Sequence, residues 1–502
     1  MRNPFSSEAP AGSGSLALWA LGVAVLASGL VVVLDASGGV KLTAAAVAGA
    51  LLVIAASASG NPRLFSLWGL MMTIPFDLSK RFGAIIAKMG GENSIRLELS
   101  DLFVLALLVY LVRDIASGRL RGLRIPKVSY VWLLIAGMGI GAMAFGTYRM
   151  TAFHEVFRMA KVLLLFLVVC NELTTPKRVL HAACGLTMGV LLQALVGMYQ
   201  YATRQHLGLD ILGETGAGTL DQLAADSVRG QGVFRVGAFL NHPNIFGAFL
   251  AALLPIALGV YMLSVGRWFK LLCLLAATFG VAALAASLSR SGWGSFAVAA
   301  VTLVVLVLLH GRLRMKALLP AAGAALVLAV VLVAFAGPIA SRLFESKPDA
   351  VLGRAEYTAT AMGVIRAKPL LGWGLNSYVY VAPNYTRFGP RATALIYKDW
   401  LPPVHNIYLL WWAETGLLGL GLHLIMLAMI VTAAIKNLKV RDETLFMINA
   451  ACLCGVIALM LDGFLSFTLR INSVLRVFWV LAAIIMAVHY QRLQEPARPQ
   501  RA

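Results

Sequence analysis

The chain has 502 residues, of which 60% are hydrophobic and 13% are charged, and its formal net charge is +20. A soluble protein of this length could not bury so much apolar surface, so the composition excludes an ordinary soluble domain. No zinc-finger, basic-helix or RNA-binding motif accompanies the positive charge, which argues against nucleic acid as a partner.

Apolar blocks near 20 residues long recur along the chain, and an α-helix needs this length to cross a bilayer core of about 30 Å. They predict an all-α polytopic membrane protein with about 14 transmembrane helices, or about 12 if two short blocks are re-entrant or tilted. The first block lacks a signal-peptide cleavage site and is expected to be retained. The blocks are residues 16–34, 42–58, 64–76, 101–112, 130–147, 157–173, 180–202, 238–265, 269–288, 291–309, 317–336, 405–433, 446–467 and 474–490.

Short basic loops alternate with less basic ones, and short basic loops are typical of the cytoplasmic side. They place both termini in the cytoplasm. The expected organisation is N-terminal transmembrane helices (1–202), a periplasmic loop (203–237), central transmembrane helices (238–336), a large periplasmic loop (337–404), C-terminal transmembrane helices (405–490) and a cytoplasmic tail (491–502). The basic loops contain Arg113, Arg119, Arg121, Arg124 and Lys127; Lys177 and Arg178; Arg267 and Lys270; Arg312, Arg314 and Lys316; and Lys436, Lys439 and Arg441.

The large loop, residues 337–404, carries eight Lys or Arg against four Asp or Glu. This excess is either ordinary solvated charge or a sign of an anionic substrate that approaches from outside. Residues 349–368 predict an amphipathic helix at the membrane surface, ended by Pro369. Arg354 and Arg366 would lie about 120° apart around this helix, too far to bind one phosphate together.

His405 is the strongest candidate for chemistry, because it opens an apolar helix directly after the basic loop. The positive end of the helix dipole favours a neutral imidazole, which can act as a general base at neutral pH. The competing interpretation is a histidine that only caps the helix. Glu414 follows nine residues later and lies on another side of the same helix, so it is a poor partner for His405.

Three arginines at predicted outer helix ends come next: Arg235, Arg290 and Arg354. Guanidinium groups bind phosphate in a bidentate way, and ionisable groups at membrane depth are often functional. The alternative for each is a side chain that only reaches the interface. His242, followed by Pro243, predicts a structural helix start rather than a second base.

Other polar residues are assigned structural roles. Arg158 and Lys161 are expected to extend to the membrane interface, whereas Asp462 is as readily a packing residue as a functional one. The five cysteines lie in apolar segments and predict neither disulfides nor a metal site. There is no Walker loop and no metal-binding motif, so no cofactor is expected.

The region around residues 230–430 resembles the bacterial O-antigen ligase and O-antigen polymerase superfamily. The similar pieces follow in order: Arg235, then Asn241-His242-Pro243-Asn244, Ser289-Arg290-Ser291, Gly353-Arg354, residues 369–374 (PLLGWG), His405-Asn406 with Tyr408-Leu409, and finally Glu414 with Gly416. The first 200 residues share with the family only a series of apolar helices.

The resemblance implies an inner-membrane glycosyltransferase with a periplasmic active site, which takes glycan from undecaprenyl diphosphate without a metal or nucleotide sugar. His405 is then the catalytic base, and Arg235, Arg290 and Arg354 hold the diphosphate. The acceptor would be a growing glycan, for a polymerase of O-antigen or exopolysaccharide, or lipid A-core, for a ligase. The helix count leans slightly toward a polymerase.

A transporter or flippase of an anionic solute or lipid-linked glycan is the alternative, since intramembrane arginine and a basic vestibule fit that function as well. Such transporters usually contain two related halves with broken helices, and no such symmetry is visible in the sequence. The main expectation is that His405 shares a single outer pocket with Arg290 and Arg354.

Overall fold

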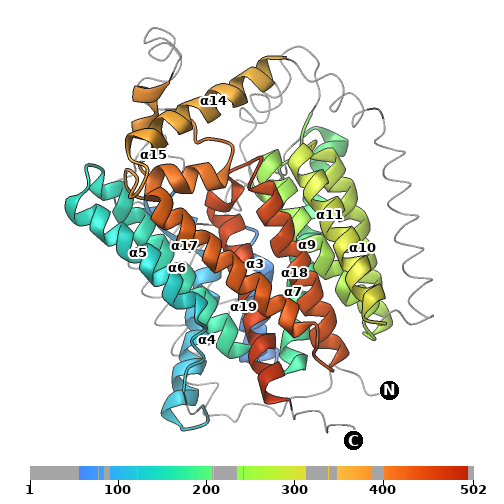
Figure 1. Cartoon of the computed structure of the whole chain (residues 1–502). Helices are drawn as coiled ribbons and strands as arrows, with labels where there is room; N and C mark the ends of the chain where they lie inside the picture. Colours follow the sequence, from blue (N-terminus) through green and yellow to red (C-terminus); the bar gives the residue numbers. More distant parts are fainter. Residues whose placement is uncertain are drawn as a thin grey trace, which may run out of the picture.

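The computed structural model describes residues 56–76, 79–83, 91–120, 122–205, 207, 234–240, 242–311, 337, 348–386 and 401–495. The predicted helices at 16–34 and 317–336, and most of that at 42–58, lie outside the described residues, as does most of the loop at 203–237. The described part is mostly helical (Figure 1). The predicted total of about 14 helices is therefore not tested.

Among the described residues, eight helices are long and apolar enough to cross a membrane. This agrees with a polytopic membrane protein, and each helix corresponds to a predicted apolar block. The eight are α5 (Val128–Phe145), α7 (Pro176–Thr203), α9 (Pro243–Met262), α10 (Arg267–Ala286), α11 (Arg290–Leu309), α17 (Ile407–Asn437), α18 (Glu443–Asp462) and α19 (Asn472–Gln494). Helix α6 (Arg149–Glu172) is as long but carries more charge.

The purely helical expectation is wrong near residue 80. Helix α3 (Pro62–Thr73) is only about 18 Å long, and it is followed by strands β1 (Ser79–Phe82) and β2 (Ile95–Glu98) before α4 (Leu99–Ala116). The strands pair antiparallel, with Ser79 opposite Glu98. The pairing satisfies the backbone groups that the two strands turn toward each other, which reduces the cost of a short break from helix between packed helices. The block at 64–76 is thus as short as predicted.

Helices α7, α9, α18 and α19 form the buried centre of the bundle, whereas α5 and α11 lie at its edge. Helix α9 contacts α7, α10, α11 and α18. On α5 and α11, large apolar side chains such as Leu134 and Val301 remain exposed. Exposed apolar faces of this kind suit contact with lipid rather than water.

The basic loops that the sequence groups together do meet at one end of the bundle. Gln491 near the end of α19 donates to the carbonyl of Leu173 between α6 and α7. The backbone of Arg441, between α17 and α18, donates to Glu495, and that of Arg124 donates to Asn171. The basic loops that contain Arg124, Arg178 and Arg441 therefore share one end, while Arg121, Arg312, Arg314 and Lys316 lie outside the described residues.

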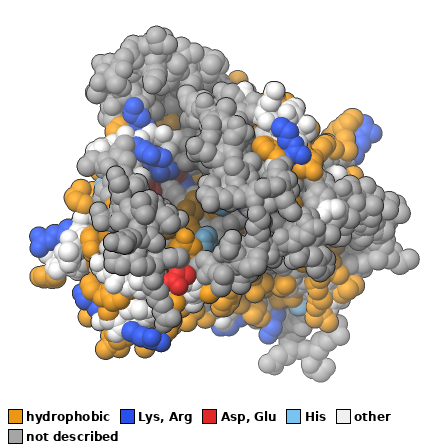
Figure 2. Space-filling view, turned by 90° about the horizontal axis from the view of Figure 1, so that it is seen from above, with side chains coloured by type: hydrophobic (Ala, Val, Ile, Leu, Met, Phe, Trp, Pro, Cys, Tyr) orange, Lys and Arg blue, Asp and Glu red, His pale blue; other side chains and the backbone are white. Residues whose placement is uncertain are grey.

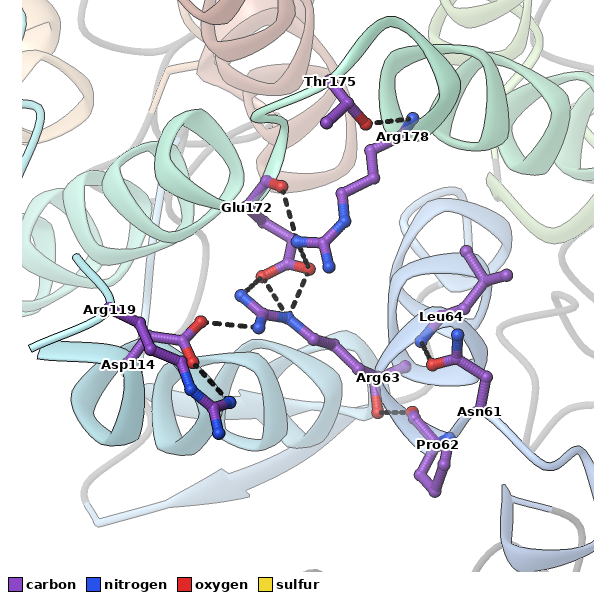
Figure 3. Close-up of polar contacts among 10 residues, drawn as sticks. Asn61, Pro62, Arg63, Leu64, Asp114, Arg119, Glu172, Thr175 and Arg178 are labelled. Carbon is purple, nitrogen blue, oxygen red and sulfur yellow. Dashed lines mark hydrogen bonds and ion pairs between the residues drawn. The ribbon is translucent and has the colours of Figure 1, made fainter. Parts of the chain in front are cut away.

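A partly buried ion cluster lies at this basic end (Figure 3). Glu172, at the end of α6, is bound by Arg63 of α3 at 2.7 Å and by Arg178 of α7 at 2.9 Å. Arg63 also contacts Asp114 of α4 at 2.6 Å. The cluster joins four helices around the buried carboxylate of Glu172, and each of its partly buried charges has a partner of opposite sign.

The opposite end carries the elements of the large loop (Figure 1). Helix α14 (Pro348–Ala367) confirms the helix predicted at 349–368, and it is followed by α15 (Tyr378–Val381) and η4 (Ala382–Tyr385). Its buried face, which includes Thr360, Ala361 and Val364, packs on protein, since α14 contacts α17 and η4. The N-termini of α9, α11 and α17 lie at this same end.

Candidate functional site

His405 lies just before α17, and the start of this helix is firmly held. The side chain of Asn406 caps the helix by accepting from the backbone N–H of Tyr408 and of Leu409, both at 3.0 Å. The backbone of Ile407 donates to the carbonyl of Gly463 at 2.8 Å, which fixes α17 against the end of α18. His405 is therefore attached to a rigid helix start rather than to a free loop.

The imidazole of His405 is half-buried between two aromatic rings. The ring of Phe467 lies 5.3 Å away and that of Tyr357 lies 6.1 Å away, measured between centroids. Burial, and then the charge of Arg354, lowers the pKa of His405 to about 4. The imidazole is neutral at pH 7, as expected from the sequence, although burial and Arg354 are the causes here rather than the helix dipole alone.

Arg354 and Arg290 complete a positively charged group around His405. Arg354 precedes Tyr357 by three residues on α14, so the two side chains share one face of that helix. Partial burial, and then the charge of Arg290, lowers the pKa of Arg354. Arg290 is the first residue of α11, where the helix dipole is positive. Within the described part of the chain, no carboxylate pairs with either arginine.

Arg354 is therefore within electrostatic range of each of the other two predicted residues. The charge of Arg354 acts on His405, and that of Arg290 acts on Arg354. Figure 2, which views this end from above, shows histidine and Lys or Arg side chains among hydrophobic ones. Two guanidinium groups without a described counter-charge, beside helix N-termini, form an arrangement suited to an anion such as phosphate.

The position of α14 over His405 is set by the segment that follows it. Residues 369–374 dock into a break in α17 at Gly416, whose φ is +66°. The backbone of Leu417 donates to Pro369 at 2.8 Å, and that of Gly374 donates to Glu414 at 2.8 Å. A Cβ at Gly416 would lie 2.1 Å from the carbonyl oxygen of Leu370. Only glycine allows this close approach at such a φ.

Glu414 anchors the next turn of the chain instead of assisting His405. Its carboxylate accepts from the backbone of Asn376 at 2.9 Å and from that of Tyr378 at 3.3 Å, and it forms an ion pair with Arg470 at 2.9 Å. The sequence indicates that Glu414 is a poor partner for His405, and these contacts give it a structural role.

Arg235 and His242 lie beside this group but are occupied by protein contacts. Arg235 is only 7% exposed. Its Nε donates to the carbonyl of Ser287 at 2.9 Å and its Nη2 donates to Asn244 at 2.7 Å. His242 caps α9 by accepting from the backbone of Asn244 at 3.1 Å, in agreement with a structural helix start. Burial, and then the charges of Arg235 and His405, lowers the pKa of His242 to about 4.

Two expectations about basic residues on α6 are wrong. Arg158 and Lys161 do not extend to the membrane interface. Arg158 is 4% exposed and pairs with Glu155, and it donates to the carbonyl of Arg470. Lys161 pairs with Asp101 of α4 at 2.6 Å. Both side chains have acceptors inside the bundle, which removes the reason for reaching toward water.

Asp462, which the sequence leaves between packing and function, accepts a hydrogen bond from the hydroxyl of Thr468. It is fully buried at the end of α18, close to Ser291. This contact supports a packing role.

Sequence reasoning missed the aromatic walls of the site. Tyr357 could have been found from its spacing to Arg354, since residues three apart share a helix face. Phe467 could not, because it comes from the turn between α18 and α19 and joins His405 only through tertiary packing.

A small cavity of about 20 Å³ lies behind the start of α17, lined by Ile407, Glu155, Arg158, Arg470 and His423 among other residues, and is large enough for one water molecule.

No group of three potential metal ligands occurs among the described residues. All five cysteines are buried free thiols. The chemistry that the described side chains themselves offer is that of a neutral imidazole beside a cluster of cations: proton acceptance together with anion binding.

The family model for O-antigen ligases matches residues 274–424. The match confirms the resemblance predicted from the motifs, and it includes Arg290, Arg354, His405 and Glu414 but not Arg235 or His242. It supports glycan transfer of the O-antigen ligase and polymerase type in general, by a multi-pass membrane protein. No curated protein matches the sequence.

Proposed function

We propose, from the match to O-antigen ligases and the geometry of the outer end, that the protein transfers glycan from undecaprenyl diphosphate to a sugar hydroxyl. The main support for this proposal is that neutral His405 lies within electrostatic range of Arg354, and Arg354 within that of Arg290. The site would face the periplasm of the bacterial inner membrane, opposite the basic loops, with both termini in the cytoplasm. No metal or other cofactor is part of the proposal.

In the proposed reaction His405 accepts the proton of the acceptor hydroxyl as its oxygen attacks the anomeric carbon of the donor glycan. The bond between that carbon and the phosphate oxygen breaks, and its electron pair leaves with the diphosphate. Arg290 and Arg354 stabilise the charge that develops on the leaving group. Attack from the side opposite the diphosphate inverts the anomeric carbon.

The free enzyme holds His405 in a weakly basic state, because burial and Arg354 oppose its protonation. A bound diphosphate would offset the charges of Arg354 and Arg290. The pKa of His405 would then rise, so that the base becomes stronger when the donor is present. Proton acceptance by His405 would then be favoured only when donor is bound.

Reconstituted full-length protein tests the proposal with undecaprenyl-diphosphate-linked oligosaccharide in vesicles. Product should form without a transmembrane gradient, and His405→Ala should lower turnover by about 10²–10⁴-fold. His310→Ala is the matched control, since His310 is exposed at the far end of α11. Normal turnover by the His405 variant would rule out the base.

A transporter or flippase of an anionic solute or lipid-linked glycan remains the rival function. Gradient-dependent flux without product in the same vesicles would favour it. Product length distinguishes the two enzymatic versions: a ladder of repeat units identifies a polymerase of O-antigen or exopolysaccharide, and single transfer to lipid A-core identifies a ligase.

A further inference from the structure

Arg235 connects three segments that are separate in sequence. It lies before α9, yet its guanidinium donates to the carbonyl of Ser287 at the end of α10 and to the side chain of Asn244 in the first turn of α9. These two bonds use Nε and Nη2, so one of the edges with which a guanidinium binds phosphate in a bidentate way is occupied by the protein. With 7% exposure, the side chain lies inside the protein.

The turn that Arg235 holds is the one that presents Arg290. Ser287 is the C-cap of α10 and Ser289 is the N-cap of α11, so only Leu288 separates the two caps. Leu288 has a φ of +49° and is buried. This left-handed conformation costs a residue other than glycine about 1–2 kcal/mol and persists only where the surroundings enforce it.

Arg235 helps to hold Leu288 in this left-handed conformation. The carbonyl of Ser287 lies at the negative end of the α10 dipole and has no partner within the helix, so a cationic donor is favourable there. Arg235 itself is held by its own segment. The backbone of Ala238 donates to Gln200 at 3.0 Å and that of Phe239 donates to Gln193 at 3.1 Å.

The starts of α9 and α11 are also packed directly together. A Cβ at Gly247 would lie 2.7 Å from the Cβ of Ser289, and one at Gly292 would lie 3.0 Å from the backbone of Gly247. A small shift of the turn at Leu288 would therefore move Arg290 relative to both helix starts.

We propose that Arg235 is a positioning residue for Arg290 rather than a ligand of the diphosphate. It fixes the turn between α10 and α11 so that Arg290 meets the leaving group at the start of α11. This assignment rests on the proposed function and departs from the role that the family resemblance gives to Arg235.

A double-mutant cycle with full-length protein tests the assignment, using KM for the lipid-linked donor, kcat, and thermal unfolding in detergent. Arg235→Ala should raise the donor KM about tenfold, and it should have no further effect when Arg290 is already alanine. Arg235→Lys should recover part of the loss. If the fold-changes in donor KM caused by the two alanine substitutions multiply in the double variant, Arg235 binds the donor independently of Arg290. That result would overturn the proposal.

Asn244→Ala keeps the inference testable if the Arg235 variants do not fold. It removes one acceptor of Arg235 while leaving the guanidinium charge in place, so a positioning role predicts a smaller rise in donor KM that also disappears in the Arg290→Ala background. An unchanged KM would contradict it. If Arg290→Ala alone leaves the donor KM unchanged, the proposed diphosphate site fails instead.

Discussion

At the basic end of the bundle Arg63 and Arg178 share the carboxylate of Glu172, whereas at the other end Arg354 lies near Arg290 and, in the described part of the chain, neither pairs with a carboxylate. The same side chain serves two purposes. Where its charge is neutralised by the protein, arginine joins helices. Where no carboxylate of the described protein pairs with the arginine, its partner is expected to be a ligand.

The largest expected effect comes from breaking the neutralised cluster. Glu172→Ala would leave Arg63 and Arg178 close together without their shared anion and should lower the free energy of unfolding by about 3–5 kcal/mol. Turnover per folded molecule should not change. Chemical denaturation in detergent measures the first quantity and the vesicle assay the second.

Arg119→Ala is the control for that experiment. Arg119 lies 3.8 Å from Asp114 but its side chain is 66% exposed, so the change should stay within about 0.5 kcal/mol. Loss of turnover in the Glu172 variant without loss of stability would break the contrast between the two ends.

The converse pattern is expected at the outer end. Arg354→Ala and Arg290→Ala should each lower kcat/KM for the donor by about tenfold to a hundredfold, because each removes a charge-assisted hydrogen bond worth about 1.5–3 kcal/mol. Stability should be unchanged or slightly higher, since one of two neighbouring like charges is gone. Arg366→Ala, an exposed arginine on the same helix, should be neutral. A large drop in stability would show that these arginines are structural.

The pH dependence of transfer sharpens the comparison. The acid limb of kcat/KM reports the free enzyme and should lie near pH 4, where the neutral imidazole of His405 becomes protonated and can no longer accept a proton. The acid limb of kcat should lie at higher pH, because the bound diphosphate offsets the charge of Arg354. Arg354→Gln should also raise the limb of kcat/KM, but only part of the way to 6.5, since burial is the larger cause. If the acid limbs of kcat and kcat/KM lie at the same pH, bound diphosphate does not raise the pKa of His405.

The smallest expected effect concerns the helix cap formed by Asn406, the residue after His405. Asn406→Ala removes the acceptor for two backbone N–H groups at the start of α17 and should lower stability by about 1 kcal/mol. Asn406→Asp should retain most of that stability, because aspartate is an equally good N-cap. Equal losses in both variants would indicate that the contact of Asn406 with Phe464 matters more than the cap.

Hydropathy and loop charge predicted the described spans and the gathering of basic loops at one end, because both depend on local composition. The spacing of motifs also indicated that His405, Arg290 and Arg354 belong together. Glu155, three residues before Arg158 on the same helix, could have been found from its spacing. Arg158 and Lys161 were misjudged because the carbonyl of Arg470 and the carboxylate of Asp101 reach them only when the helices pack.

The hairpin and the contacts of Arg235 were missed for different reasons. Strands β1 and β2 are four residues each, too short for a period-two pattern to stand out among helices. Arg235 has the residue type and position of a phosphate ligand, and its bonds to Ser287 and Asn244 form only in the folded chain.

The break in α17 at Gly416 also bears on how such a protein could diversify. Since main-chain hydrogen bonds between residues 369–374 and α17 hold α14 above His405, the register of the two does not depend on the length of chain that connects them. A change in the length of that connection would then leave the placement of α14 over His405 unchanged.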